Sequence, residues 1–150
     1  MAITKNNTRM LDGSIDLATQ TTGNIDITTQ VTGYTEGTWT PSLSALGTSG
    51  STINFAEFTK IGRVVHFICH VTFVSNSDTS AIAITGLPYS GNNSKIQSLP
   101  TPFTNYTSGA LIPIVQDTTI YIGKNNYSAD ATYQDLSGKY LRISGSYQIL

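Results

Sequence analysis

Apolar and polar side chains alternate along several segments of this sequence, most clearly over residues 63–74 (RVVHFICHVTFV). One face of that segment carries five apolar side chains: Val65, Phe67, Cys69, Val71 and Phe73. The opposite face includes His66 and His70. Alternation with a period of two is typical of a β-strand that buries one face. The pattern therefore predicts a strand over residues 63–74 whose odd-numbered positions lie in the core.

Similar segments recur through the chain and predict five further strands, over residues 52–61, 80–85, 110–115, 118–122 and 139–149. Asn, Asp, Gly and Pro separate them, and no window of about a dozen residues has the apolar stripe of a helix. Many short strands with closely spaced turns predict an all-β fold, an antiparallel β-sandwich or jelly roll. Residues 90–108, rich in Asn, Ser, Pro and Gly, are expected to form the longest exposed loop.

Residues 13–33 contain a repeat of ten residues, in which GSIDLATQTTG is followed by GNIDITTQVTG with the middle glycine shared. Seven positions are identical between the two units. Each unit predicts one short strand that ends in a glycine turn, and repeats this small bury their apolar side chains only against neighbours. Four side chains are therefore expected to contact other copies of the chain or another protein: Ile15, Leu17, Ile25 and Ile27.

The repeat divides the chain into two parts. We interpret residues 1–35 as an extended attachment leader and residues 36–150 as one β-domain, because 150 residues leave room for a single ordinary domain. A flexible leader rich in Thr and Gly is the alternative interpretation of the first part. Trp39 is expected to anchor the junction between the two, and it fits a plain core position equally well.

The composition narrows the classes of function. Only 11% of the residues are charged, and 8 basic against 9 acidic residues give a net charge of −1, so the basic surface that nucleic acid requires is missing. We expect no membrane insertion, because no apolar run is long enough for a signal peptide or a membrane span. A single cysteine, Cys69, excludes an internal disulfide and fits folding in a reducing cytoplasm.

His66, Cys69 and His70 resemble a metal-binding cluster at first sight. On a strand, however, alternation places Cys69 on the face opposite both histidines, which themselves lie ~13 Å apart at ~3.3 Å per residue. A zinc ion needs all its ligands within ~2.3 Å. We therefore expect no metal site and assign the two histidines to a sheet surface or an interface.

Other signatures of catalysis are also missing. The six carboxylates of the domain lie mostly in turn-like contexts: Glu36, Glu57, Asp78, Asp117, Asp130 and Asp135. Glycoside cleavage needs two such groups held across one bond. There is no Gly-x-Ser-x-Gly motif, and Gly123-Lys124 is followed by Asn125 rather than by the Ser or Thr of a phosphate-binding loop. The chain is therefore expected not to be an enzyme and to need no cofactor.

Tyrosine and asparagine gather within and beside two segments that show little alternation, residues 90–108 and 124–135. Flat amphipathic rings beside amide groups suit contact with sugars, and they equally suit a subunit interface or ordinary packing, which is the simpler interpretation of the rings. Eight residues are the candidate receptor or glycan contacts: Tyr89, Asn92, Asn93, Asn105, Tyr106, Asn126, Tyr127 and Tyr133.

Four short phrases in the domain resemble those of small β-domains in bacteriophage tail fibres and tailspikes. They occur in that family's order, at residues 36–41 (EGTWTP), 59–65 (TKIGRVV), 84–88 (ITGLP) and 143–147 (ISGSY). The leader unit GSIDL is similar to segments that precede phage fibre modules. The resemblance implies a trimeric, fibre-associated β-sandwich knob without catalysis of its own.

Together these observations predict a structural protein of a bacteriophage virion, folded in the host bacterial cytoplasm. The leader is expected to bind another virion protein, and the knob, as a homotrimer, to attach the particle to a host surface glycan. A short repeat with an apolar stripe favours oligomers, because copies wound together cover one another's strand edges. A capsid decoration or head-fibre protein that stabilises the particle is the alternative function.

Overall fold

The computed structural model describes residues 33–43, 51–92 and 96–149. Those residues form eleven β-strands joined by turns and loops, and none of them is helical. The described ranges accordingly contain no helix able to span a membrane. The strands are β1 (Tyr34–Thr38), β2 (Ser42–Leu43), β3 (Thr52–Ile61), β4 (Val64–Thr72), β5 (Ala83–Thr85), β6 (Gln97–Ser98), β7 (Phe103–Thr104), β8 (Leu111–Gln116), β9 (Thr119–Lys124), β10 (Ala129–Asp130) and β11 (Tyr140–Gln148).

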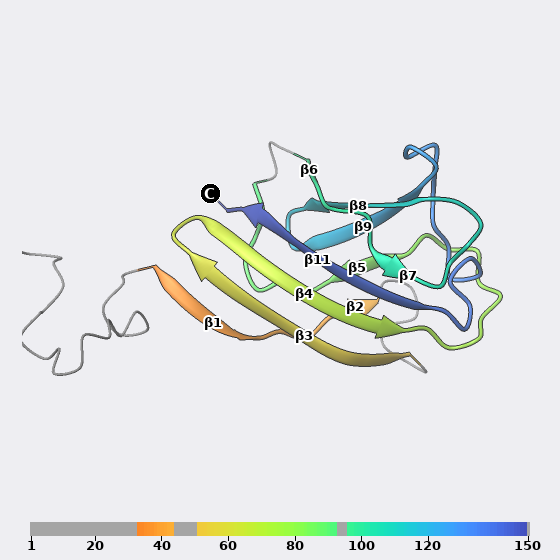
Figure 1. Cartoon of the computed structure of the whole chain (residues 1–150), viewed down its shortest axis with the longest axis horizontal. Coiled ribbons are helices and arrows are strands. Elements are labelled where there is room, and N and C mark those ends of the chain that lie inside the picture. Colours follow the sequence, from red (N-terminus) through yellow and green to blue (C-terminus); the bar gives the residue numbers. More distant parts are fainter. Residues whose placement is uncertain (1–32, 44–50, 93–95, 150) are drawn as a thin grey trace, which may run out of the picture.

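The strands form two antiparallel sheets that lie one in front of the other (Figure 1). The first is five-stranded, in the order β1-β3-β4-β11-β7. The second is six-stranded and runs β2-β5-β9-β8-β6, with β10 paired to β9. Every strand pair in both sheets is antiparallel. The predicted all-β antiparallel fold is confirmed, and the two layers are consistent with the predicted β-sandwich.

Strands were predicted best where alternation is strong. β3 has the predicted bounds, and β4, β8, β9 and β11 begin and end within two residues of theirs. β5 is shorter than the predicted segment 80–85, of which Ala81 makes only an isolated bridge to Thr132.

The prediction of residues 90–108 as one exposed loop is wrong in part. This segment contains β6, which pairs with β8, and β7, which pairs with β11. Leu99, between the two strands, is 6% exposed and belongs to the core. Two-residue edge strands join a sheet through backbone hydrogen bonds, so they leave no alternation in the sequence to detect.

The segment predicted as an attachment leader, residues 1–35, lies almost wholly outside the described residues. Its four apolar positions, Ile15, Leu17, Ile25 and Ile27, stay predictions. Tyr34 and Thr35, which were assigned to the leader, belong to β1 and pair with Ile61 and Lys60 of β3. The first sheet therefore begins before residue 36.

The core lies between the two sheets and takes side chains from both. On β4 the predicted odd-numbered face is buried, with Val65 and Cys69 at 0% exposure, whereas His66 is exposed. Leu141 of β11 and Ile122 of β9 are likewise fully buried. No polar or charged side chain is buried within the described ranges. The fold is thus stabilised chiefly by apolar burial, at roughly 25 cal/mol per Å² removed from water.

Trp39 occupies a core position just after β1. Its side chain is 8% exposed and meets the Phe67 ring edge to face, with 6.2 Å between centroids. Its backbone N–H donates to the Ala56 carbonyl at 3.1 Å. The buried indole Nε1 has no hydrogen-bond acceptor among the residues that the structure describes. Trp39 therefore fixes the end of β1 to the core through packing.

Candidate functional site

A row of large side chains crosses the solvent face of the five-stranded sheet. The strand register places Phe55 of β3 opposite His70 of β4. Arg142 of β11 pairs with His70 on one side and with Phe103 of β7 on the other. Directly paired residues of antiparallel strands point to the same face of a sheet. These four residues and Tyr140, two positions before Arg142, are called the aromatic platform below.

Ring contacts connect the members of the platform. His70 meets Phe55 edge to face at 5.5 Å between centroids, and it meets Tyr140 in the same way at 6.0 Å. Tyr140 lies 5.7 Å from Phe103 with the two rings inclined at 35°. Such pairs contribute about 0.5–1.5 kcal/mol each beyond simple burial. Phe103 is nevertheless 65% exposed, so the platform presents an ordered aromatic surface to solvent.

Arg142 supplies the charge of the platform. Its guanidinium lies 5.5 Å from the centroid of Phe55 and 6.0 Å from that of Phe103. It makes no hydrogen bond or ion pair with any residue that the structure describes. Burial, and then the positive charge of Arg142, lower the pKa of His70 below its ordinary value. At pH 7 His70 is therefore neutral, and Arg142 is the charged group.

An open groove of about 460 Å³ lies on the same sheet face, along β1, β3 and β4. Glu36, Glu57 and His66 are among its lining residues. The Tyr34 hydroxyl donates to the Glu36 carboxylate, and the Nδ1 atom of His66 lies 2.6 Å from the Ser146 hydroxyl oxygen. Within the described ranges no three His, Cys, Asp or Glu side chains come together as metal ligands. The groove is thus an open surface on the platform's sheet face, lined by apolar side chains such as Phe58 and Ile68 as well as by the two carboxylates.

The predicted placement of Cys69 on the face of β4 opposite His66 and His70 is confirmed. Cys69 is buried in the core at 0% exposure, while His66 is exposed and His70 is part-exposed on the opposite face of β4. The thiol is therefore out of reach of both imidazoles.

The loop residues predicted as glycan contacts are placed in several different environments. Tyr89 packs on Phe58 at 5.7 Å between centroids, and Tyr106 packs partly against the core. Asn92 donates its backbone N–H to the Gln148 carbonyl at 3.0 Å. Asn105 lies beside the platform, because its side-chain oxygen accepts the backbone N–H of Tyr140 at 3.0 Å. Asn93 lies outside the described residues.

The prediction of Tyr133 as a glycan contact is wrong. Its side chain is 2% exposed, and its ring meets that of Phe73 edge to face at 6.4 Å. A ring enclosed in the core cannot stack on a sugar. The Asp and Gln around Tyr133 in the sequence suggested a surface loop, but the chain turns this one side chain inward.

Asn126 and Tyr127 remain at the surface, in the turn between β9 and β10. Asn125, Asn126 and Tyr127 all have positive φ angles, of 49°, 62° and 62°. This left-handed conformation is tolerated by Asn and unfavourable for a bulky aromatic residue. The Tyr127 ring covers Gly123, where any Cβ would collide with it, and the side chain is 37% exposed. The turn therefore presents Tyr127 on the outer face of the second sheet, away from the platform.

Comparisons with protein-family models, with curated proteins and with solved structures found no match to this chain. Its function is therefore inferred from its own side chains and their geometry.

Four members of the platform were not singled out from the sequence: Phe55, Phe103, Tyr140 and Arg142. A signal existed for two of them, because Tyr140 and Arg142 occupy the outward positions of the alternating segment 139–149. Phe55 and Phe103 had no such signal. Phe55 follows an irregular register in β3, and Phe103 lies in the segment predicted as a loop.

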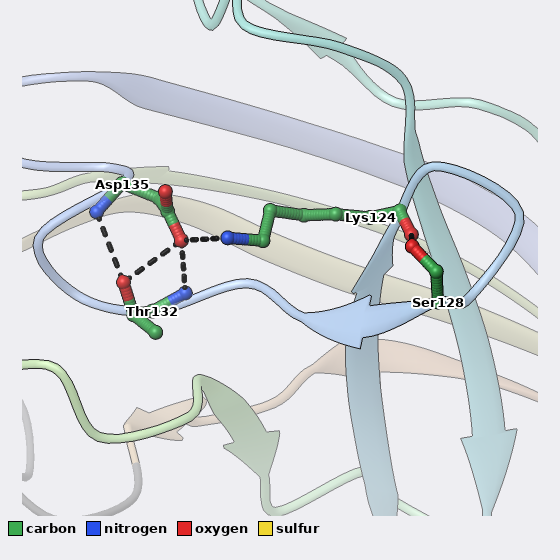
Figure 2. A network of polar contacts seen from close by, with 4 residues as sticks. All are labelled: Lys124, Ser128, Thr132 and Asp135. Carbon is green, nitrogen blue, oxygen red and sulfur yellow. Dashed lines mark hydrogen bonds and ion pairs between the residues drawn. The ribbon is translucent and has the colours of Figure 1, made fainter.

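An ion pair and several hydrogen bonds hold the loop that follows β10 (Figure 2). The Asp135 carboxylate lies 2.7 Å from the Lys124 ammonium and accepts the Thr132 backbone N–H and hydroxyl, both at 2.8 Å. The Ser128 hydroxyl donates to the Lys124 carbonyl at 3.4 Å. These contacts tie the end of β9 to the segment that carries buried Tyr133.

We expect Asp135→Asn to destabilise the domain by about 1 kcal/mol at pH 7, a modest value because the pair is partly exposed. Burial raises the pKa of the Asp135 carboxyl, but the hydrogen bonds from Lys124 and Thr132 outweigh burial and leave that pKa below its ordinary value. Because the Asp135 carboxyl has a lower pKa in the folded than in the unfolded protein, its ionised form stabilises the fold at pH values above the unfolded pKa of about 3.9. This stabilisation is lost as the pH falls through the folded-state pKa. Urea unfolding at pH 7 and pH 3 measures it.

The difference in unfolding free energy between wild type and Asp135→Asn should therefore shrink at pH 3. The matched control is Asp130→Asn, because Asp130 is an exposed carboxylate with no ion pair to a described residue. An equal loss of stability in both variants would show that the Lys124–Asp135 contact is not responsible.

Proposed function

We propose that this chain is a structural protein of a bacteriophage virion, and that its β-sandwich attaches the particle to a glycan on the host surface. The observation that carries the proposal is the aromatic platform, an ordered row of rings on a solvent-exposed sheet face. Sugars present C–H faces that pack on aromatic rings, and their hydroxyl groups bind nearby polar groups. Exposed apolar patches that are held in place commonly mark interaction sites.

The phrases that resemble phage fibre domains support the same proposal through their places in the fold. Residues 36–41 contribute to β1 and the Trp39 anchor, and residues 59–65 span the end of β3, the turn and the start of β4. Residues 143–147 lie in β11. Three of the four phrases thus contribute to the sheet that carries the platform.

The proposal includes a homotrimer in which residues 1–35 of each chain bind another virion protein. A single ring or amide contact with a sugar contributes only about 1 kcal/mol net. One sandwich would then bind weakly, whereas three platforms on one particle-bound trimer would gain ~10²–10⁴-fold from avidity. Attachment therefore does not require a deep or enclosed site on each copy.

We expect Phe103→Ala to weaken binding of the purified full-length protein to susceptible bacteria by roughly 5–10-fold per site, because the most exposed ring of the platform is removed. The matched control is Ile96→Ala, since Ile96 is also 65% exposed but lies just before β6 of the other sheet. Flow cytometry with labelled protein and competition with phage adsorption measure the effect.

Attachment through the platform would be supported if wild-type protein and Ile96→Ala coat cells and block phage adsorption, and Phe103→Ala binds cells more weakly. Equal binding by both variants would place the contact elsewhere on the domain. Protein that ignores cells but binds particles assembled without it would instead favour capsid decoration.

A further inference from the structure

We infer that the aromatic platform recognises an acidic sugar, a uronic acid whose carboxylate pairs with Arg142 while its ring stacks on Phe103. The inference rests on the proposed glycan attachment and adds the chemical class of the ligand. It starts from the one charged group on the platform that the described chain leaves without a counter-charge.

The Arg142 guanidinium is positioned before any ligand arrives. The rings of Phe55 and Phe103 lie 5.5 and 6.0 Å from it, Phe103 on the neighbouring strand β7 and Phe55 on β3, beyond β4 on the other side. Such contacts restrict the side chain, so less conformational freedom is lost on binding. The guanidinium donates in a planar fork whose geometry matches the two oxygens of a carboxylate. Because none of its donors is bonded to a described residue, the whole fork is available.

No described carboxylate competes for this position. Glu57 of β3 pairs with Ile68, two residues along β4 from His70 and two strands away from β11. That register separates the backbones of Glu57 and Arg142 by about 12 Å, from ~3.3 Å per residue and ~4.8 Å per strand. The ion pair within the described ranges joins Lys124 and Asp135, in the region of the other sheet. An anion bound at Arg142 therefore meets a positive charge that no described carboxylate neutralises.

The rings beside Arg142 explain why the anion should belong to a sugar. Phe103 is 65% exposed and directly opposite Arg142 in the register, so a ring stacked on Phe103 places a substituent near the guanidinium. Tyr140, 5.7 Å from Phe103, adds a second amphipathic ring to the same surface. A pyranose ring that carries a carboxylate group can stack on Phe103 and also pair with Arg142, whereas a free inorganic anion would use only Arg142.

His70 adds a dependence on pH to the same site. His70 contacts the rings of Phe55 and Tyr140 and pairs with Arg142, while Glu57 of β3 and His66 of its own strand lie farther along the same sheet face. Neutral at pH 7, His70 gains a charge as the pH falls below its lowered pKa, and a bound carboxylate favours that charged form. Affinity for a uronic acid should therefore rise as the pH falls through the lowered pKa of His70, and His70→Gln should remove the rise.

The test uses the full-length protein and three probes: trigalacturonate, the neutral trisaccharide maltotriose and glucose 6-phosphate. Calorimetric or NMR titration at pH 7 should show trigalacturonate binding at least about tenfold more tightly than maltotriose. Arg142→Ala should abolish this preference, and Arg142→Lys should reduce it about threefold to fivefold, because an ammonium cannot form the bidentate fork. Arg63→Lys, the same substitution at the turn between β3 and β4, is the matched control and should leave the preference unchanged.

Preference for trigalacturonate that is lost in Arg142→Ala but kept in Arg63→Lys would support the inference. Equal affinity for trigalacturonate and maltotriose, or a preference unaffected by Arg142→Ala, would overturn it while leaving glycan attachment intact. Binding of glucose 6-phosphate without trigalacturonate would overturn the assignment of a carboxylate. If wild-type protein also fails to coat cells, the proposed attachment function fails with it.

Discussion

Replacing Tyr133 by alanine is expected to destabilise the domain by about 3–5 kcal/mol. Tyr133 is 2% exposed, and its ring packs edge to face on Phe73 within the shared core. Truncation removes the apolar contacts of a large ring and leaves a cavity that close-packed neighbours fill only in part. Domains of this kind have a total stability of only ~5–15 kcal/mol, so the variant should unfold at much lower urea concentration.

Tyr121→Ala is the matched control, because Tyr121 is 39% exposed on β9 and its loss should cost about 1 kcal/mol or less. Urea unfolding followed by circular dichroism compares the two variants. Similar midpoints for Tyr133→Ala and Tyr121→Ala would contradict the core position of Tyr133. Such a result, together with weaker binding to cells, would return Tyr133 to the candidate glycan contacts.

The Cys69 thiol is expected to react about 10³-fold more slowly with a thiol reagent in the folded protein than in the unfolded protein at pH 8. Burial raises the pKa of Cys69 to about 12, although a backbone hydrogen bond with Ile143 acts in the opposite direction. Only the thiolate is nucleophilic, and it makes up about a quarter of an ordinary thiol at pH 8 but roughly 10⁻⁴ of a thiol with this pKa. Blocked access in the core slows the reaction further.

Labelling with a chromogenic disulfide, with and without denaturant, measures the two rates. The chain has one cysteine, so the signal needs no assignment and the denatured sample is the control for reagent activity. Folded protein that reacts as fast as denatured protein would mean that Cys69 is not in the core. That result would also reverse the assignment of the two faces of β4, and with it the outward position of His70.

The strongest sequence patterns predicted the fold where a strand has one face in the core. On β4 the alternation of Val65, Phe67 and Cys69 with His66 reflects burial directly, because every second side chain is removed from water on folding. β11 was predicted for the same reason. The short strands β6 and β7 were missed because they join the sheets through backbone groups, which every residue carries.

A register shift between Ile53 and Phe55 shows where alternation fails. Ile53 pairs with Val71 and Phe55 pairs with His70. Between these two pairs β3 contributes two residues, whereas β4 contributes one. Such a bulge reverses the faces of all following residues. Simple alternation from Ile53 would have buried Phe55, whereas the bulge at Asn54 turns the Phe55 ring outward to join the platform.

Residue types along the chain were enough to predict an all-β antiparallel fold, the inner face of β4 and the separation of Cys69 from both histidines. These features follow from the two-residue period of a strand and from the burial of apolar side chains, which are local properties. The aromatic platform depended on tertiary structure, because its members come from strands as far apart in the chain as Phe55 in β3 and Arg142 in β11. Only strand pairing brings them into one row, and the energy of that pairing comes from a core to which both sheets contribute.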